Sequence, residues 1–145
     1  MKYINIFAIA FALAVALSLS SFSASATDAP SAKERLVIQV SDADPGKWNL
    51  ALNNAKNVQQ AYGADNVDIE IVTYGPGIGM LKLDSAIATR IDESKKAGIE
   101  IVACQNTMKN MKLTADDMLP NTSYVPSGVV ELIKKQKEGY AYIRP

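Results

Sequence analysis

The single cysteine of this 145-residue chain, Cys104, lies at the junction of a predicted strand and a predicted helix, a position that favours a reactive thiol. It follows the apolar run IEIVA and precedes the polar residues QNT, a pattern typical of a buried strand that passes into a helix. Unpaired N–H groups and the dipole at a helix start favour a thiolate, and they lower the pKa of a cysteine from about 8.5 toward neutrality. The pattern therefore predicts a nucleophile that needs no neighbouring histidine.

Four other residues are candidates for substrate binding beside the thiol. Asn106 and Thr107 flank Cys104 at the predicted helix start, although residues of these types also cap helices. Gly77 lies in the loop GPGIG and Ser127 in the loop PSG, each directly after a predicted strand. Loops at the carboxyl ends of strands form the ligand crevice of an open α/β sheet, so we expect all four residues at the edge that carries the thiol. GPGIG lacks the spacing of a dinucleotide fingerprint, which leaves a tight packing loop as the alternative for its glycines.

The position of Cys104 also fits two other hypotheses. Free cysteine is among the most buried residue types and often serves as a small apolar side chain, which makes an unreactive core thiol the first alternative. In that case the chain would be an oligomeric protein that binds a small ligand or assembles with a partner. One cysteine cannot close an intrachain disulfide, so a redox sensor that forms an intermolecular disulfide is the second alternative.

The residue composition argues against several other kinds of site. The chain has no histidine, which disfavours Ser-His-Asp and Cys-His hydrolysis, zinc binding and histidine-ligated haem. Asp42 and Asp44 precede a predicted helix, where aspartates more often form caps and turns than a catalytic pair. The methionines Met108, Met111 and Met118 are better suited to core packing than to a copper site, because no other soft ligands accompany them. The sequence thus predicts no metal and no cofactor.

The first 26 residues have the pattern of a secretory signal peptide. Lys2 precedes the apolar run INIFAIAFALAVALSL, and the small residues of Ala24-Ser25-Ala26 form a cleavage pattern. We expect cleavage after Ala26, a periplasmic or secreted location, and no stable membrane insertion afterwards. Removing 26 of 145 residues, with Lys2 as their only charge, leaves 119 residues with 14 basic and 15 acidic side chains. This balance gives no general attraction to nucleic acid.

The remaining residues, 27–145, alternate between strand and helix patterns and are expected to form one domain. Short apolar strands separated by helices predict a mainly parallel sheet covered on both faces, a three-layer α/β sandwich, because a parallel crossover needs a connection of helix length. The expected strands cover residues 35–40, 67–74, 99–104, 122–126 and 140–145. The expected helices cover 45–62, 83–98, a short stretch from about 106, a brief start at 114–117, and 128–139.

Several segments resemble the DsrE/DsrF-like family of small α/β proteins, in particular its exported single-domain branch. The most specific are ACQNT and PSGVVEL with KEGYAYIRP, and the similarity extends from VIQVSDAD to the C-terminus. The resemblance implies a five-stranded, flavodoxin-like layered fold and homo-oligomers, often trimers or hexamers. It also implies a sulfur carrier, at most of sulfurtransferase type, that holds a persulfide on Cys104 and exchanges sulfur with a donor and an acceptor protein.

Overall fold

The computed structural model describes residues 33–145, and the predicted signal peptide, residues 1–26, lies outside them. Five strands are present: β1 (Glu34–Val40), β2 (Val67–Thr73), β3 (Glu100–Cys104), β4 (Ser123–Val125) and β5 (Ala141–Ile143). The α-helices are α2 (Pro45–Tyr62), α3 (Ala88–Lys96), α4 (Gln105–Asn110) and α5 (Gly128–Lys137). Three short 3-10 helices are η1 (Ala64–Asn66), η2 (Gly75–Leu81) and η3 (Ala115–Asp117). Among these residues no helix is both long enough and apolar enough to cross a bilayer.

The five strands form one parallel sheet in the order β4-β3-β2-β1-β5. The central strands are apolar along most of their length because both of their faces are covered. The predicted α/β fold with a parallel five-stranded sheet is therefore confirmed. Flavodoxins share this layered arrangement but have the strand order 2-1-3-4-5, so the flavodoxin-like description holds for the layers and not for the order of the strands.

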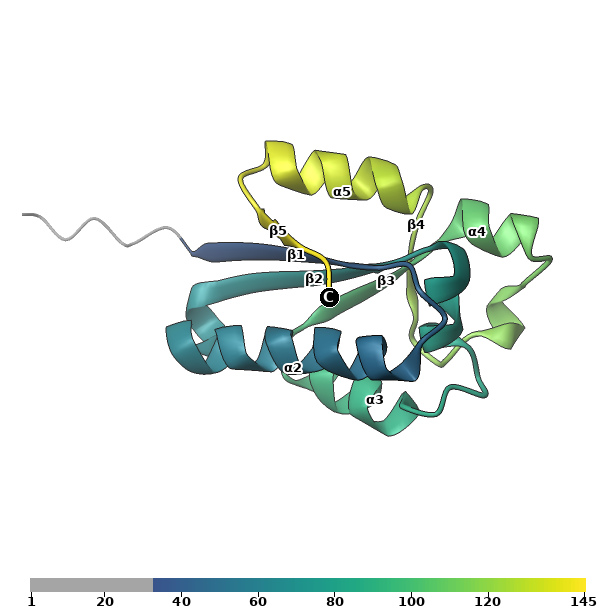
Figure 1. The fold of residues 1–145 in the computed structure, drawn as a ribbon, viewed down its shortest axis with the longest axis horizontal. Coiled ribbons are helices and arrows are strands. Elements are labelled where there is room, and N and C mark those ends of the chain that lie inside the picture. The colour runs from purple at the N-terminus through teal and green to yellow at the C-terminus, as the bar shows by residue number, and fades with distance from the viewer. Residues whose placement is uncertain (1–32) are drawn as a thin grey trace, which may run out of the picture. The chain divides into compact units, whose positions relative to one another are not determined.

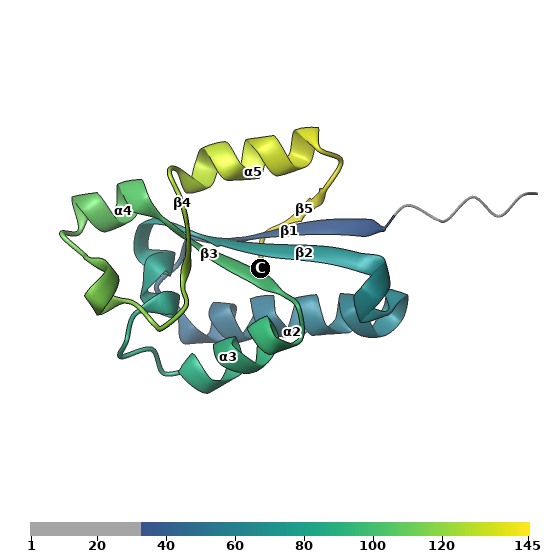
Figure 2. The same cartoon turned by 180° about the vertical axis from the view of Figure 1, so that it is seen from behind.

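The helices divide between the two faces of the sheet as right-handed crossovers require (Figure 1). From β1 to β4 each new strand is added on the same side of the previous one, which places α2 and α3 on one face. The last strand, β5, is added beside β1 at the opposite edge, so the crossover through α5 runs over the other face. Figure 2 shows the same division from behind.

The two faces bury apolar cores of unequal size. The cluster on the face of α2 and α3 contains twenty buried residues, including Trp48, Leu52, Ile71 and Met108. The cluster on the face of α5 contains four buried residues, Val37, Val72, Val102 and Leu132. The apolar attachment of α5 to the sheet is therefore small, and other contacts must help to fix the position of this helix.

The helix predicted over residues 83–98 is wrong in its first part, because α3 begins only at Ala88. In the preceding segment the Leu83 N–H donates to the Asp117 carbonyl at 3.0 Å, and Lys82 forms an isolated bridge with Met118. Between these contacts and α3 the Ser85 N–H donates to the Lys82 carbonyl at 2.9 Å and the Ala88 N–H to the Ser85 carbonyl at 3.3 Å, so the chain forms turns in place of the i to i+4 bonds of an α-helix. The other predicted elements are confirmed to within two residues at their ends, and the loop GPGIG is part of η2.

Candidate functional site

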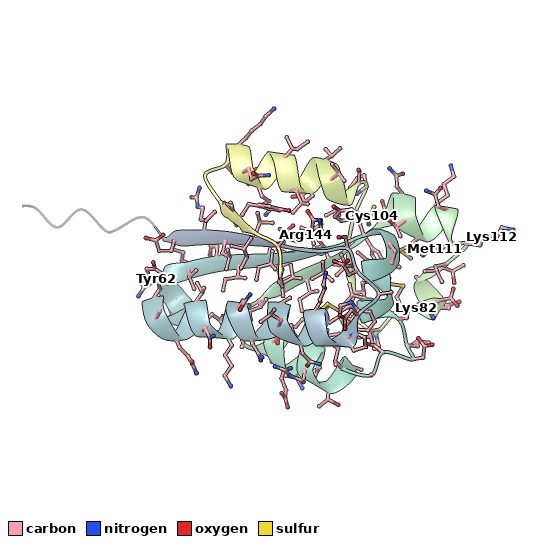
Figure 3. All side chains as sticks on the ribbon, viewed as in Figure 1. Tyr62, Lys82, Cys104, Met111, Lys112 and Arg144 are labelled. Atoms are coloured by element: carbon pink, nitrogen blue, oxygen red, sulfur yellow. The ribbon has the colours of Figure 1, made fainter. Side chains whose placement is uncertain are left out.

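Cys104 lies at an edge of the sheet where two connections diverge. It ends β3 and is the register partner of Val125, which ends β4. After β3 the chain enters α4, whose Met108 belongs to the core on the face of α2 and α3, whereas after β4 it enters α5 on the opposite face. Open α/β sheets bind ligands at such divergences, at the carboxyl ends of the strands. Figure 3 shows Cys104 at this edge, beside the start of α5.

The Cys104 sulfur has hydrogen-bond donors from two elements. The Thr107 N–H donates to Cys104 Sγ at 3.4 Å, so the cysteine itself caps α4. The Thr107 hydroxyl and the Gly128 N–H at the start of α5 lie near enough to the sulfur to lower the pKa of the thiol. The Asn106 N–H donates to the Pro126 carbonyl at 3.2 Å and also contributes to lowering the pKa of the thiol. Several donors that converge on one atom suit a negatively charged sulfur.

The net effect of these surroundings is a lowered pKa of the Cys104 thiol. Burial has the largest single effect and raises the pKa, since the residue is only 4 % exposed and its charge is poorly solvated. The hydrogen bonds from Thr107, Gly128 and Asn106 act in the opposite direction and together outweigh burial. The thiolate is therefore favoured by specific donors, without a histidine or a basic side chain.

Thr107 connects the thiol to the segment that follows β2. Its Oγ1 accepts a hydrogen bond from the Gly75 N–H at 2.9 Å, which leaves the hydroxyl proton free for the Cys104 sulfur. Gly75 has a φ of +53°, in the left-handed region that favours glycine. Thr107 therefore touches the thiol directly, while Gly75 supports it from a loop in which the sequence analysis singled out Gly77.

Gly77 has a packing role instead. A Cβ at this position would lie 2.3 Å from the Val40 carbonyl oxygen at the end of β1. The Gly77 N–H donates to the Tyr74 carbonyl at 3.1 Å, so it is not free to bind an anion. The structure thus places Gly77 against the end of β1, where only glycine fits, and this corresponds to the packing alternative for this loop.

The side chains of Asn106 and Ser127 also lie at the thiol edge. Asn106 is exposed and lies two residues after Cys104, while Ser127 is half-buried and immediately precedes Gly128. Ser127 is the N-cap residue of α5, yet its side chain makes no capping hydrogen bond. Its hydroxyl is therefore available to another group at this edge.

Gly128 is a site residue that was expected in the PSG loop and at the start of the helix over 128–139, but without a role at the thiol. A Cβ at Gly128 would lie 2.9 Å from the Tyr74 Cβ, so a side chain here requires α5 to shift. Glycine thus lets the first N–H of α5 approach the sulfur. The only sequence signal was a glycine directly after an N-cap serine, and glycine is also common at ordinary helix starts.

The other sequence candidates have structural roles. Asp44 Oδ1 accepts a hydrogen bond from the Gly46 N–H at 2.8 Å and caps α2. Asp42 forms ion pairs with Lys47 at 3.2 Å and Arg144 at 3.4 Å. Within residues 33–145 no group of three histidines, cysteines or acidic residues is arranged to hold a metal ion.

A comparison with protein families places the chain among known proteins. The model of the DsrE/DsrF-like family matches residues 12–145, which include all five strands and the thiol edge. The chain belongs to this family. The resemblance seen in the sequence is therefore confirmed, although no curated protein matches this DsrE/DsrF-like chain.

Two solved structures share the fold of this DsrE/DsrF-like protein. A protein of unknown function from Methanobacterium thermoautotrophicum is 32 % identical, and the match covers 78 % of this chain and 100 % of that chain with a TM-score of 0.74. A conserved protein of unknown function from Bacteroides thetaiotaomicron is 18 % identical, with 77 % and 95 % covered and a TM-score of 0.63. The second similarity supports the fold alone, and neither relative assigns a reaction.

Proposed function

We propose that this DsrE/DsrF-like protein is a sulfur carrier that holds a persulfide on Cys104. The observation that most supports this role is the Thr107 N–H that donates to the Cys104 sulfur at 3.4 Å, in surroundings that include the Gly128 N–H and lower the pKa of the thiol. A carrier needs a stabilised thiolate both when it accepts sulfur and when it releases sulfur. The resemblance to sulfur-relay proteins implies a sulfur-carrying cysteine after a central strand, and Cys104 ends β3.

Each half of the reaction is a thiol exchange at sulfur. In loading, the Cys104 thiolate attacks the outer sulfur of a donor persulfide, R–S–SH, so that a new S–S bond forms, the donor S–S bond breaks, and the donor leaves as R–S⁻. In unloading, an acceptor thiolate attacks the outer sulfur on Cys104, and Cys104 leaves as a thiolate. The transferred sulfur keeps its proton and oxidation level, so no external oxidant or reductant is needed. A stabilised thiolate is the nucleophile in the first step and the leaving group in the second.

The surrounding residues have separate tasks in this proposal. Thr107 and Gly128 bind the inner sulfur, while the Asn106 side chain and the Ser127 hydroxyl bind the outer sulfur. Because Cys104 is 4 % exposed, a donor can reach only a small part of its side chain. This favours a persulfide on a projecting protein segment, or a small hydropersulfide, over a thiol on a flat surface.

The direct test is the intact mass of the mature protein, isolated without reductant and then offered a persulfide donor. We expect the mass of one additional sulfur atom, which is lost on mild reduction and absent from Cys104→Ser. A wild-type protein that stays unmodified, while an exposed thiol in the same tube is loaded, would overturn the proposal.

A second candidate function is an assembly or ligand-binding protein with an unreactive thiol. Two observations favour it: the burial of Cys104, and the exposed apolar side chains of Val129, Val130 and Ile133 on α5, of which Val130 is 62 % exposed. In this proposal copies of the chain associate as a trimer or hexamer through α5. The mass in solution should then fall for Val130→Asp and Ile133→Asp but not for Cys104→Ala, and α5 variants of wild-type mass would contradict it.

We also propose that the chain is exported and cleaved after Ala26. The apolar run that follows Lys2 and the small residues up to Ala26 support this. N-terminal sequencing of protein recovered from the periplasm or the medium should start at Thr27. Recovery of a chain that still begins with Met1 from the cytoplasm would contradict the proposal.

A further inference from the structure

A buried ion pair fastens α5 to the middle of the sheet. Lys135 Nζ on α5 lies 2.6 Å from Glu70 Oε2 on β2, and the two side chains are only 15 % and 5 % exposed. The Tyr140 ring packs against the same ammonium group, with its centroid 4.9 Å from Lys135 Nζ. This pair lies outside the thiol site and has no part in the proposed sulfur exchange.

The apolar contact of α5 leaves its position along the sheet weakly determined. Within α5 only Gly128 and Leu132 are buried, and Leu132 packs on a row of three valines. The partly buried side chains of Tyr74, Val125 and Tyr140 pack beside this contact. An apolar contact of this small size fixes the distance of a helix from the sheet better than its position along its own axis. A short N–O contact with a fixed partner on β2 restricts both the axial position and the rotation of α5.

The ion pair is also poorly suited to stabilising the fold. Glu70 Oε1 is buried without a hydrogen-bond partner within the described part of the chain. Glu100, the register partner of Glu70, and Glu131 on α5 add negative charge nearby. Apolar residues in place of a buried ion pair often preserve or increase stability. A pair with an unsatisfied oxygen and acidic neighbours is therefore better explained by the position that it imposes.

The two ends of α5 connect this pair to the thiol. Lys135 lies seven residues after Gly128, which is about 10 Å along the axis of a helix. Over two turns a helix moves as a rigid body, so a shift at Lys135 displaces the Gly128 N–H from the sulfur. We propose that the Lys135–Glu70 pair is a positioning element that holds the first N–H of α5 against Cys104. The inference rests on the proposed function for its purpose, but its test needs no sulfur transfer.

The test measures the thiol pKa, from the rate of Cys104 alkylation against pH, together with the thermal unfolding temperature. Glu70→Gln and Lys135→Met should remain folded. In each variant the fraction of Cys104 present as thiolate at neutral pH should fall at least about threefold. Lys134→Met is the matched control, because Lys134 is the neighbouring lysine on α5, is exposed, and pairs with Glu131 instead. Lys134→Met should leave the thiol pKa unchanged.

Two more variants separate positioning from stability. The double variant Glu70→Leu/Lys135→Met removes the charges but keeps apolar volume, and it should be as stable as the wild type while its thiol pKa is raised. Lys135→Arg keeps the ion pair, so it should keep most of the thiolate fraction that Lys135→Met loses. A wild-type thiol pKa in the folded double variant would overturn the inference, whatever happens to the unfolding temperature. If the pKa shifts as expected but the wild type never accepts sulfur, only the proposed function fails.

Discussion

The Thr107 hydroxyl oxygen accepts a hydrogen bond from the Gly75 N–H at 2.9 Å, across a gap of 32 residues in the sequence. Since a threonine hydroxyl has a single proton, this contact orients the oxygen and leaves the proton for the Cys104 sulfur. The segment after β2 thus helps to set the properties of a thiol at the end of β3. The acidity of this thiol is therefore a property of the tertiary structure and not only of the helix that follows it.

Thr107→Val should raise the thiol pKa, because the variant keeps the shape of the side chain but loses the hydroxyl donor. A hydrogen bond to a charged group contributes about 1.5 kcal/mol or more, so alkylation of Cys104 at neutral pH should slow about tenfold. Thr107→Ser keeps the hydroxyl and should react nearly as fast as the wild type. The check is the rate of iodoacetamide modification against pH, and equal rates in all three proteins would show that the hydroxyl does not reach the thiolate.

Gly128→Ala should also weaken the thiolate, by moving the start of α5. The new Cβ would lie 2.9 Å from the Tyr74 Cβ, so the helix must shift and carry the Gly128 N–H away from the sulfur. The thiol pKa, followed by the ultraviolet absorbance of the thiolate during a pH titration, should therefore rise. Val129→Ala truncates the exposed neighbour and serves as the control. An unchanged titration of Gly128→Ala would show that the start of α5 does not affect the thiol pKa.

The elements of the fold were predictable where neighbouring residues determine them. The apolar run before Cys104 marks a buried strand, and Asp44 caps α2 through the nearby Gly46 N–H, as the sequence indicated. The strand order was not predictable in this way. Whether β5 pairs with β1 or with β4 depends on distant edges that no local pattern specifies. The shortened start of α3 likewise follows from a contact between Leu83 and Asp117.

The candidate site shows the same division between local and distant causes. Cys104 and Thr107 could be placed together from sequence because they share one helix start. The contribution of Gly128 depends on the contact between the start of α5 and the end of β3. Neither local sequence alone predicts this contact. Lys135 and Glu70 are likewise far apart in sequence, so their ion pair was missed.

Gly77→Ala should be strongly destabilising, which would distinguish packing from substrate binding at this position. The added Cβ would lie 2.3 Å from the Val40 carbonyl oxygen, and backbone atoms cannot move aside as a flexible side chain can. We expect a loss of about 3 kcal/mol in the free energy of unfolding, measured in urea. Gly46→Ala is the control, because its Cβ would meet only the Asp44 carboxylate, at 3.1 Å. A stable Gly77→Ala that fails to accept sulfur would instead favour a role in binding.

The stability difference between the wild type and Glu70→Gln should depend on pH. Burial raises the pKa of Glu70 above its ordinary value of 4.5, against the lowering effect of Lys135. A group with a raised pKa in the folded state contributes stability below its unfolded pKa, and this contribution is lost as the pH rises through the folded pKa. Glutamine cannot lose a proton, so the free energy of unfolding of the wild type should fall relative to Glu70→Gln over a pH range that begins near the ordinary pKa of 4.5 and extends upward.

Urea unfolding of both proteins across this range measures the difference directly. Surface carboxylates such as Asp42, whose pKa is lowered by its hydrogen bond to Lys47, affect both proteins equally and cancel. If the wild type instead gained stability relative to Glu70→Gln as the pH rose, the attraction of Lys135 would outweigh burial, and the pKa of Glu70 would be lowered. The ion pair would then stabilise the fold in its own right, which would weaken the argument that its purpose is to position α5.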